Sequence, residues 1–202
     1  MNNRDLIIEM AMKEFSKYGY EKASLNNILK KSNLSKGTFY HYFKSKEELY
    51  MEIMSLLADM KYGILDDLFK DKDILEKMDF FDALEYLIDR SLEFMFQNPL
   101  MFSFSINFLK EKGNSIYDKV FEKFNPSRED MMEKYFDYFY NKTNFRKDIS
   151  KESIYKYYQL LLGGIIGIID IENLKEKTDE IRKTFEDIFK IAKNGMIEKG
   201  YT

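Results

Sequence analysis

Only two prolines and nine glycines interrupt the 202 residues of this chain, and apolar residues recur three or four positions apart along nearly all of it. That spacing places apolar side chains on one stripe of an α-helix. In residues 4–18, for example, the stripe contains Ile8, Ala11 and Phe15, and Gly19 follows as the expected C-terminal stop. No segment shows the sustained apolar–polar alternation of a half-buried strand. The sequence therefore predicts an all-α fold.

Helix start signals divide this pattern into separate elements. Ser24 and Ser35 are good N-caps, because a serine hydroxyl accepts hydrogen bonds from the free N–H groups of a first turn. Ser45 and Glu48 form a capping box, and two Asn-Pro pairs mark further starts. After the first helix, we expect helices from Ser24, from Ser35 and from Ser45, and then at about 79–97, 99–111, 114–124, 126–141, 150–173 and 178–198.

The composition is that of a soluble protein. Hydrophobic residues make up 45% of the chain and charged residues 33%, which is ordinary for a globular domain and unlike a disordered segment. There is no cysteine, so disulfides and thiolate chemistry are excluded. The first residues do not resemble a signal peptide, and the longest apolar run, residues 160–169, has about half the length of a membrane span. We therefore expect a cytoplasmic protein with no membrane partner.

Charge is distributed unevenly along the chain. Residues 1–50 hold nine Lys/Arg and six Asp/Glu, whereas residues 51–202 hold 23 and 29. Between Lys22 and Lys46 there are six lysines and no acid. In a chain where a third of the residues are charged, so long a gap in one sign indicates an anionic partner. A solvated basic face is the alternative that charge alone leaves open.

The segment NLSKGTFYHYFKSKEELY, residues 33–50, indicates which anion this is. Asn33 tolerates the left-handed conformation of a tight turn, and on the short helix that follows Phe39 and Phe43 share the side that can join a core. The residues that point away from that side or flank it are Lys36, Gly37, Thr38, Tyr40, His41 and Tyr42. A short helix after a tight turn, with hydroxyls, a glycine and cations on its outer face, is typical of a DNA recognition helix in the major groove. A helical hairpin whose tyrosines merely pack is the alternative.

The run SNLSKGTFYHYFKSKEELY resembles the signature of the TetR family of transcriptional regulators. The matching residues are Ser35, Gly37, Thr38, Tyr40, Tyr42, Phe43, Ser45, Lys46, Glu47 and Leu49. Upstream, KEFSKYGYEKASL resembles the end of the family's first helix, with Phe15, Gly19 and Tyr20 in register. The departures from the family pattern are Glu14, Leu29, Ser32 and Asn33, none of which is a presumed contact residue. The resemblance covers residues 4–60 well and then fades to a shared helix layout.

The resemblance implies a helix-turn-helix DNA-binding domain in residues 1–48, which would bind a double-stranded DNA operator. It also implies a helical ligand-binding and dimerisation domain in residues 49–202. The residues that would face bases are Lys36, Gly37, Thr38 and Tyr40, with Asn26 a weaker candidate, and those that would hold phosphates are Tyr42 and Lys46. Ser24, Ser35 and His41 complete the expected DNA-binding set, His41 as an exposed or phosphate-adjacent residue.

In the family, the C-terminal domain forms a homodimer, and this chain has a segment suited to that role. Three glycines interrupt the expected helix at 150–173, although glycine inside a helix costs about 1 kcal/mol relative to alanine. Close approach of two helices would explain them, and a two-fold interface would use that approach twice. The expected dimerisation residues are Leu160, Gly163, Gly164, Gly167, Ile181, Phe185, Ile188 and Phe189. An intramolecular core is the alternative.

In the family, the same domain binds a small-molecule effector. Aromatic and methionine side chains crowd residues 80–108, and such walls suit an apolar or flat ligand. The expected ligand-binding residues are Phe81, Tyr86, Phe94, Met95, Phe102, Phe104 and Phe108. Aromatic stripes at helical spacing also make plain core, so that interpretation stays open. The acids Asp82, Glu85, Asp89 and Glu93 share one helix face, which we expect to be solvated.

Together these features predict a ligand-responsive transcriptional repressor that binds a palindromic operator as a homodimer and is released by a small apolar or aromatic effector. The alternative is a helical DNA-binding regulator that is controlled by a protein partner or has no effector. An enzyme is not expected, because the chain has one histidine, no cysteine and neither a G-x-S-x-G nor a glycine-rich phosphate motif. No catalytic residue, cofactor or metal site is expected either, since the lone His41 cannot form a metal site by itself.

Overall fold

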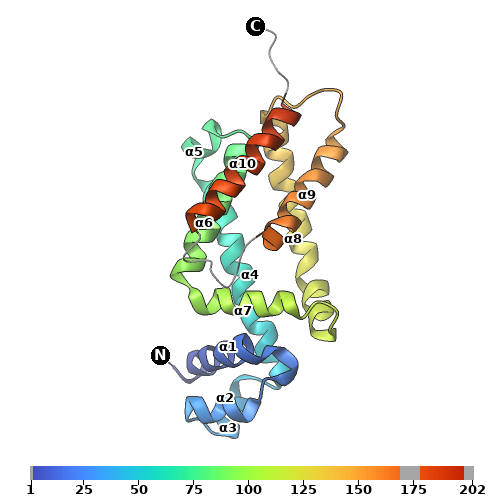
Figure 1. The fold of residues 1–202 in the computed structure, drawn as a ribbon. Helices are drawn as coiled ribbons and strands as arrows, with labels where there is room; N and C mark the ends of the chain where they lie inside the picture. Colours follow the sequence, from blue (N-terminus) through green and yellow to red (C-terminus); the bar gives the residue numbers. More distant parts are fainter. Residues whose placement is uncertain (1, 169–177, 198–202) are drawn as a thin grey trace. The chain divides into compact units, whose positions relative to one another are not determined.

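The computed structural model describes residues 2–168 and 178–197, and within this range it leaves the side chains of residues 61, 127, 128, 162–168 and 178 undescribed. The described residues form helices and no strand (Figure 1), which confirms the all-α fold class. The helices are α1 (Asn3–Lys22), α2 (Leu25–Ser32), α3 (Lys36–Tyr42), α4 (Lys46–Lys70), α5 (Lys72–Lys77), α6 (Phe80–Gln97), α7 (Pro99–Lys110), α8 (Ser115–Lys142), α9 (Lys151–Ile168) and α10 (Thr178–Met196). Within this part of the chain, no helix is both long and apolar enough to cross a membrane.

The chain folds into two compact units. The first unit comprises Met1–Ile64 and Glu93–Ser127, and the second comprises Leu65–Leu92 and Arg128–Thr202. Helices α4, α6 and α8 contribute to both units, because the unit boundaries fall within them. The first unit therefore combines the N-terminal helices with α7 and the beginning of α8. The expected functional boundary between residues 48 and 49 stays a prediction.

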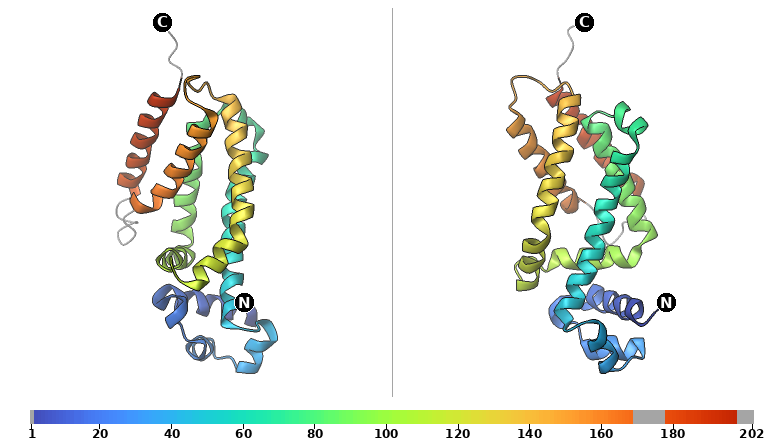
Figure 2. Two further views of the ribbon diagram at one scale, coloured as in Figure 1. Left: turned by 90° about the vertical axis from the view of Figure 1, so that its right-hand side faces the viewer. Right: turned by 180° about the vertical axis from the view of Figure 1, so that it is seen from behind.

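The first unit is built around α1, which packs against α2, α3 and α7 (Figure 2). The ring of Phe15 on α1 lies 4.9 Å from that of Tyr50 and 6.3 Å from that of Phe104, measured between centroids. Other buried side chains of this core are Ile7, Ala11, Ile28, Leu29, Phe39, Phe43, Leu49 and Ile53. Each large apolar side chain contributes about 1.5–3 kcal/mol when fully buried, so α7 adds directly to the stability of the N-terminal helices.

The predicted serine caps and the predicted turn form in this unit. Ser24, Ser35 and Ser45 each accept a hydrogen bond from the backbone N–H three residues ahead, at 3.4, 3.1 and 3.0 Å. Glu48 reaches back past the N-cap and accepts from the backbone N–H of Lys44 at 2.6 Å, rather than from the Ser45 N–H as the predicted capping box requires. Asn33 ends α2 in the left-handed conformation, with φ 55° and ψ 35°. The sequence therefore predicts the helix-turn-helix correctly at its turn and at each of these helix starts.

Two elements differ from the prediction. The expected helices 114–124 and 126–141 are a single helix, α8, with Pro126 in its interior. A proline there removes one N–H donor and crowds the preceding turn at a cost of about 3 kcal/mol, so packing along α8 outweighs the local start signal. The boundary between the two units nevertheless follows Ser127. The short helix α5, capped by Asp71, was not predicted.

The second unit has an aromatic core. Phe80 at the start of α6 lies with its ring centroid 5.8 Å from that of Phe136 on α8 and 5.4 Å from that of Tyr158 on α9. Helices α8 and α9 run alongside each other (Figure 2), and the rings of Phe136 and Tyr155 approach to 4.8 Å. Three helices of this unit are therefore joined by ring contacts.

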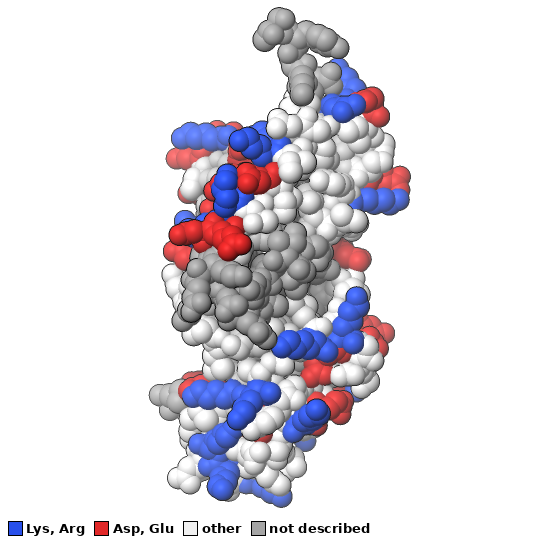
Figure 3. Space-filling model, in the orientation of Figure 1, with Lys and Arg blue, Asp and Glu red and all other residues white. Residues whose placement is uncertain are grey.

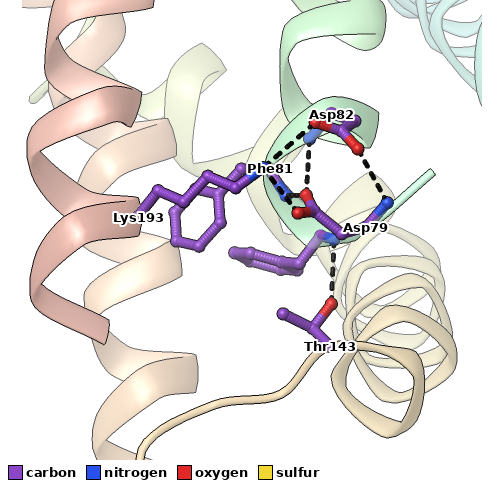
Figure 4. Close-up of polar contacts among 6 residues, drawn as sticks. Asp79, Phe81, Asp82, Thr143 and Lys193 are labelled. Carbon is purple, nitrogen blue, oxygen red and sulfur yellow. Dashed lines mark hydrogen bonds and ion pairs between the residues drawn. The ribbon is translucent and has the colours of Figure 1, made fainter. Parts of the chain in front are cut away.

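A polar cluster ties the start of α6 to the ends of α8 and α10 (Figure 4). Asp79 and Asp82 each accept a hydrogen bond from the other's backbone N–H at 3.0 Å. The Lys193 ammonium lies 2.6 Å from the Asp79 carboxylate and 3.3 Å from that of Asp82. Thr143 accepts from the backbone N–H of Phe80 at 2.9 Å. These contacts satisfy the free N–H groups of the first turn of α6.

The acidic face of α6 is only partly the solvated surface that we expected. Besides the contact of Asp82 with Lys193, Asp89 pairs with Arg182 of α10 at 2.9 Å. Burial, followed by the nearby carboxylate of Asp82, raises the pKa of Glu85. The acids of α6 therefore help to hold α10 in the second unit.

Candidate DNA-binding site

Helix α3 presents its polar side chains at the surface of the first unit. Phe39 is fully buried, whereas Tyr40 keeps 56% of its surface exposed. Thr38 is half-buried, and its Oγ1 lies 2.9 Å from Ser35 Oγ, so the two hydroxyls hydrogen-bond to each other. The remaining exposed positions of this helix are Lys36, Gly37 and His41. The side chains that a recognition helix would offer to base edges are therefore accessible.

The buried side of α3 is held firmly. The rings of Phe39 and Phe43 lie 5.8 Å apart, and the guanidinium of Arg4 lies 5.6 Å above the ring of Phe43. Arg4 also pairs with Glu52, so it connects the start of α1 to α4 next to the end of α3. A helix that must present side chains to a rigid duplex needs such support.

Four of the six lysines between positions 22 and 46 remain available for an anion. They are Lys22, Lys30, Lys36 and Lys44. All four are exposed, and none of them forms an ion pair with the described part of the chain. Figure 3 shows basic side chains gathered at the lower end of that view, where α2 and α3 lie. Lysines without a carboxylate partner are suited to the phosphate backbone of DNA.

Lys46, which was expected to hold a phosphate, contacts backbone oxygens in this structure, and its phosphate role stays a prediction. Its ammonium donates to the carbonyl oxygens of Tyr20 at 2.8 Å, Ala23 at 3.2 Å and Glu21 at 3.4 Å. It also lies 4.5 Å from the centre of the Tyr20 ring. An ammonium has three N–H donors, and these carbonyls use all three. Lys46 therefore stabilises the end of α1.

Lys31 is engaged as well, through a buried carboxylate that departs from the family pattern. Glu14 is 1% exposed and accepts from the Lys31 ammonium at 2.6 Å, from Asn27 Nδ2 at 3.1 Å and from the Ser24 N–H at 3.4 Å. Burial raises the pKa of Glu14, but the hydrogen bonds from Lys31, Asn27 and Ser24 lower it further, and the pKa lies below its usual value. A polar network thus holds α2 on α1 where an apolar residue is usual.

The other expected DNA-binding residues take several positions. The hydroxyls of Ser24 and Ser35 serve as N-caps, and Asn26 is exposed on the first turn of α2. Tyr42 is half-buried, with its ring 4.8 Å from that of His41. Asn26 and Tyr42 therefore remain candidates for DNA contacts, and the two serines act through helix geometry.

Residues 7–53 match the family described as "Bacterial regulatory proteins, tetR family". This span contains most of α1, all of α2 and α3, and the first turns of α4, which together place Thr38 and Tyr40 at the surface. This part of the chain is a TetR-family N-terminal region. Proteins of the TetR family are DNA-binding transcription regulators and not enzymes.

Known relatives share the same region. YhgD, an uncharacterized HTH-type transcriptional regulator of Bacillus subtilis, is 42% identical over 62 residues, which are 30% of this chain and 32% of YhgD. The HTH-type transcriptional regulator QacR of Staphylococcus aureus is 41% identical over 56 residues, 28% of this chain and 30% of QacR. The chain therefore spans less than a third of the length of these curated relatives.

The fold similarity extends further than the sequence similarity. A TetR family transcriptional regulator from Chloroflexus aurantiacus superposes with a TM-score of 0.61 over 98% of this chain and 94% of that chain, at 19% identity. At this level of identity the similarity concerns the fold alone. The helices beyond the DNA-binding region thus follow the TetR layout, while their side chains are particular to this protein.

The expected ligand-binding residues are divided between the two compact units. Phe81 and Tyr86 belong to the second compact unit, and the other five belong to the first. Phe81 and Phe104 are each 1% exposed, and Phe104 packs in the core that supports the DNA-binding helices, with its ring 5.2 Å from that of Tyr50. Both phenylalanines are buried in a core of this structure, and their role in ligand binding stays a prediction. Phe94, Met95, Phe102 and Phe108 are half-buried, as is Tyr86.

The expected dimerisation residues differ in burial. Ile181, Phe185 and Phe189 are 6%, 3% and 1% exposed, so in this structure they belong to the core of the second unit. Leu160 on α9 is 70% exposed, as an interface residue should be, and Ile188 is half-buried. Gly163, Gly164 and Gly167 lie within α9, but what surrounds them is outside the described residues, as are the expected helix ends at 173 and 198.

The densest aromatic region of the second unit was not among the predicted ligand-binding residues. Five of the six residues from 135 to 140 are aromatic, and they pack against Tyr155 and Tyr158 of α9. Tyr135 is fully buried, and its hydroxyl has no hydrogen-bond partner in the described part of the protein. The cluster YFDYFY, followed by YKYY, is visible in the sequence. It lies outside residues 80–108, from which the ligand-binding residues were predicted.

Two further features bear on ligands. A hollow between α6 and α10 is lined by Glu85, Ile88, Asp89, Arg182, Phe185, Glu186 and Phe189. Its charged rim, where Arg182 already pairs with Asp89, does not suit an apolar molecule. Among the described residues, no group of histidine and acidic side chains could hold a metal ion.

Proposed function

We propose that this protein is a ligand-responsive repressor that binds a palindromic DNA operator as a homodimer and is released by a small apolar or aromatic effector. The observation that carries the DNA-binding part is the surface of α3, where Tyr40 is 56% exposed beside the fully buried Phe39. The unpaired lysines of α2 and α3 would position this helix on phosphates. TetR-family regulators are often repressors, which favours repression over activation.

The mechanism follows from two-fold symmetry. In a homodimer, two α3 helices would enter major grooves one helical turn apart, about 34–36 Å. An effector that binds preferentially to a conformation with another spacing would lower operator affinity through that difference in affinity alone. A dimer surface is supported by the exposed apolar side chains of α9 and α10, which include Tyr157, Leu160 and Ile191.

The aromatic region around Tyr135 supports an effector with a ring and one hydrogen-bonding group. The Tyr135 ring lies 4.9 Å from that of Phe139, 5.9 Å from that of Phe69 and 6.5 Å from that of Tyr158. A buried hydroxyl without a partner costs about 1–3 kcal/mol. A bound aromatic molecule that accepts a hydrogen bond from Tyr135 would recover this energy and favour the conformation that admits it.

The experiment that tests this function is selection of bound duplexes from a random DNA pool by the purified full-length protein. We expect a palindrome whose half-sites are separated by one helical turn, and sedimentation of the complex as two chains per duplex. Enrichment of no motif, or of a motif without two-fold symmetry, would contradict the proposal. A thermal-shift screen of aromatic compounds then separates an effector-controlled repressor from one without an effector.

A further inference from the structure

The end of α1 contains a joint that only glycine can form. Gly19 has φ 70° and ψ 177°, so the helix breaks there, three residues before its end. Residues with a side chain are essentially excluded from this region of backbone conformation. A Cβ at position 19 would also collide with the Oε1 atom of Glu111, which is placed against the glycine by the turn after α7.

Glu111 binds this joint directly. The residue is 7% exposed, and its Oε1 accepts the backbone N–H of Tyr20 at 2.6 Å. Its Oε2 accepts from Asn114 Nδ2 at 2.5 Å. A carboxylate can accept at both oxygens, whereas a glutamine would oppose one of the two donors with its own amino group. A buried carboxylate is costly unless it is hydrogen-bonded, and here both of its oxygens are.

Lys46 binds the backbone of Tyr20 from the carbonyl side. While Glu111 accepts from the Tyr20 N–H, the Lys46 ammonium donates to the Tyr20 carbonyl at 2.8 Å and to the carbonyl of Ala23 at 3.2 Å. The helix-turn-helix begins only five residues after Tyr20, with α2 at Leu25. The direction in which the chain enters the helix-turn-helix is therefore fixed between Glu111 and Lys46.

We infer that Glu111 is a positioning residue for DNA binding, although it lies far outside the DNA-binding sequence of residues 7–53. It acts through the Tyr20 backbone and thereby sets how α2 and α3 are presented. Asn107 on α7 reinforces the contact by donating to the carbonyl of Ser16 on α1. The effect on DNA affinity rests on the proposed function, but the hydrogen bond from Tyr20 to Glu111 can be tested by amide hydrogen exchange without DNA.

The test compares Glu111→Gln with the double variant Glu111→Gln/Asn114→Asp. In the single variant, the hydrogen bond to Tyr20 loses its charge, and the Asn114 amide must rotate so that its oxygen faces the new amide. We expect affinity for the duplex selected by the wild-type protein to fall about tenfold, and amide hydrogen exchange at Tyr20 to accelerate. In the double variant, the carboxylate introduced at position 114 accepts from the new amide, so affinity and exchange protection should recover toward wild type.

Two controls separate positioning from general stability. Glu122→Gln changes an exposed glutamate of α8 and should alter neither readout. Phe139→Leu removes a buried ring from the core of the second unit, and its DNA affinity gives the loss that accompanies a lower melting temperature. An affinity loss in Glu111→Gln no larger than in Phe139→Leu, at equal melting temperature, would overturn the inference. Failure of the double variant to recover affinity would overturn it as well.

The outcome for DNA and the outcome for the joint are distinguishable. If the wild-type protein binds no duplex, the proposed function is contradicted, and so is the role of Glu111 in DNA binding. Suppose instead that the wild type binds DNA normally and that amide exchange at Tyr20 is unchanged in Glu111→Gln. The proposed function then stands, and only the role of Glu111 is contradicted.

Discussion

The lysines of the DNA-binding region fall into two groups. Some are exposed and free to contact DNA, and others bind oxygen atoms of the protein itself. Lys46 and Lys31 look the same in sequence as Lys36 and Lys44. In the structure, however, Lys46 donates to backbone carbonyls and Lys31 donates to Glu14. This division could not be predicted from the sequence, because the partners of Lys46 and Lys31 come from α1. Spacing predicts which residues share a helix face, but not which distant oxygen a flexible ammonium will reach.

The two kinds of lysine should respond differently to substitution. We expect Lys44→Ala to weaken binding to all duplexes and to reduce the slope of log affinity against log salt by about 1, because one phosphate contact is lost. Lys46→Ala should instead lower the free energy of unfolding by about 1.5–3 kcal/mol, the range for hydrogen bonds to a charged group. Salt titrations of DNA binding and chemical denaturation measure both. A smaller salt slope for Lys46→Ala, without loss of stability, would restore its assignment to a phosphate.

The carboxylate of Glu14 predicts a pH dependence of stability. Because its pKa is lower in the folded protein than its usual value of 4.5, Glu14 stabilises the fold fully above that value. The contribution is lost as the pH falls from there through the folded pKa. The unfolding free energy of the wild type should therefore decline more steeply below about pH 4.5 than that of Glu14→Gln. Parallel declines, measured by urea unfolding at several pH values, would contradict the network.

The hydroxyl of Tyr135 gives a test of the effector site. Tyr135→Phe removes an unpartnered buried polar group, so we expect the melting temperature of the ligand-free protein to be unchanged or higher. An aromatic carbonyl compound that stabilises the wild type should stabilise the variant less, while its hydrocarbon analogue should act equally on both. Tyr18→Phe, an exposed position on α1, is the control. A lower melting temperature in Tyr135→Phe would mean that the hydroxyl already has a partner.

Among the elements, those defined by local chemistry were predicted well. The serine caps and the turn at Asn33 depend on residues within a few positions of each other, and all of them form. The interior position of Pro126 and the burial of Phe104 were not predicted, because long-range packing decides both. The same limit explains the ligand and dimer residues, where aromatic spacing alone does not distinguish a core from a binding surface.

The turn of the helix-turn-helix supplies a prediction at this scale. Asn33 has φ 55°, a conformation in which most residues with a Cβ are strained by about 1–2 kcal/mol. Asn33→Ala should therefore lower stability by about 1 kcal/mol, and Asn33→Gly, the usual family residue, should leave it unchanged or raise it. Thermal unfolding of both variants measures this. Equal stability of the two variants would show that the turn does not depend on the left-handed conformation.

In the whole molecule, the DNA-binding helices do not form a separate N-terminal piece. Phe104, Ile116 and Val120 from α7 and α8 complete their core, and Glu111 fixes the joint before α2. A boundary at residue 48 follows the family signature, whereas the compact unit extends to Ile64 and includes residues 93–127. Sequence alone could not show this, since the added segment follows the signature by some 40 residues and carries no motif of its own.

The claim on which the account depends is that the exposed face of α3 reads DNA sequence. The most direct measurement is the affinity of wild-type and Tyr40→Ala protein for the selected duplex and for a scrambled duplex of the same composition. The account predicts that the wild type prefers the selected duplex and that Tyr40→Ala loses about 1–3 kcal/mol of this preference, with little change on the scrambled duplex. Equal preference in both proteins, or no binding of either duplex by the wild type at low salt, would contradict it.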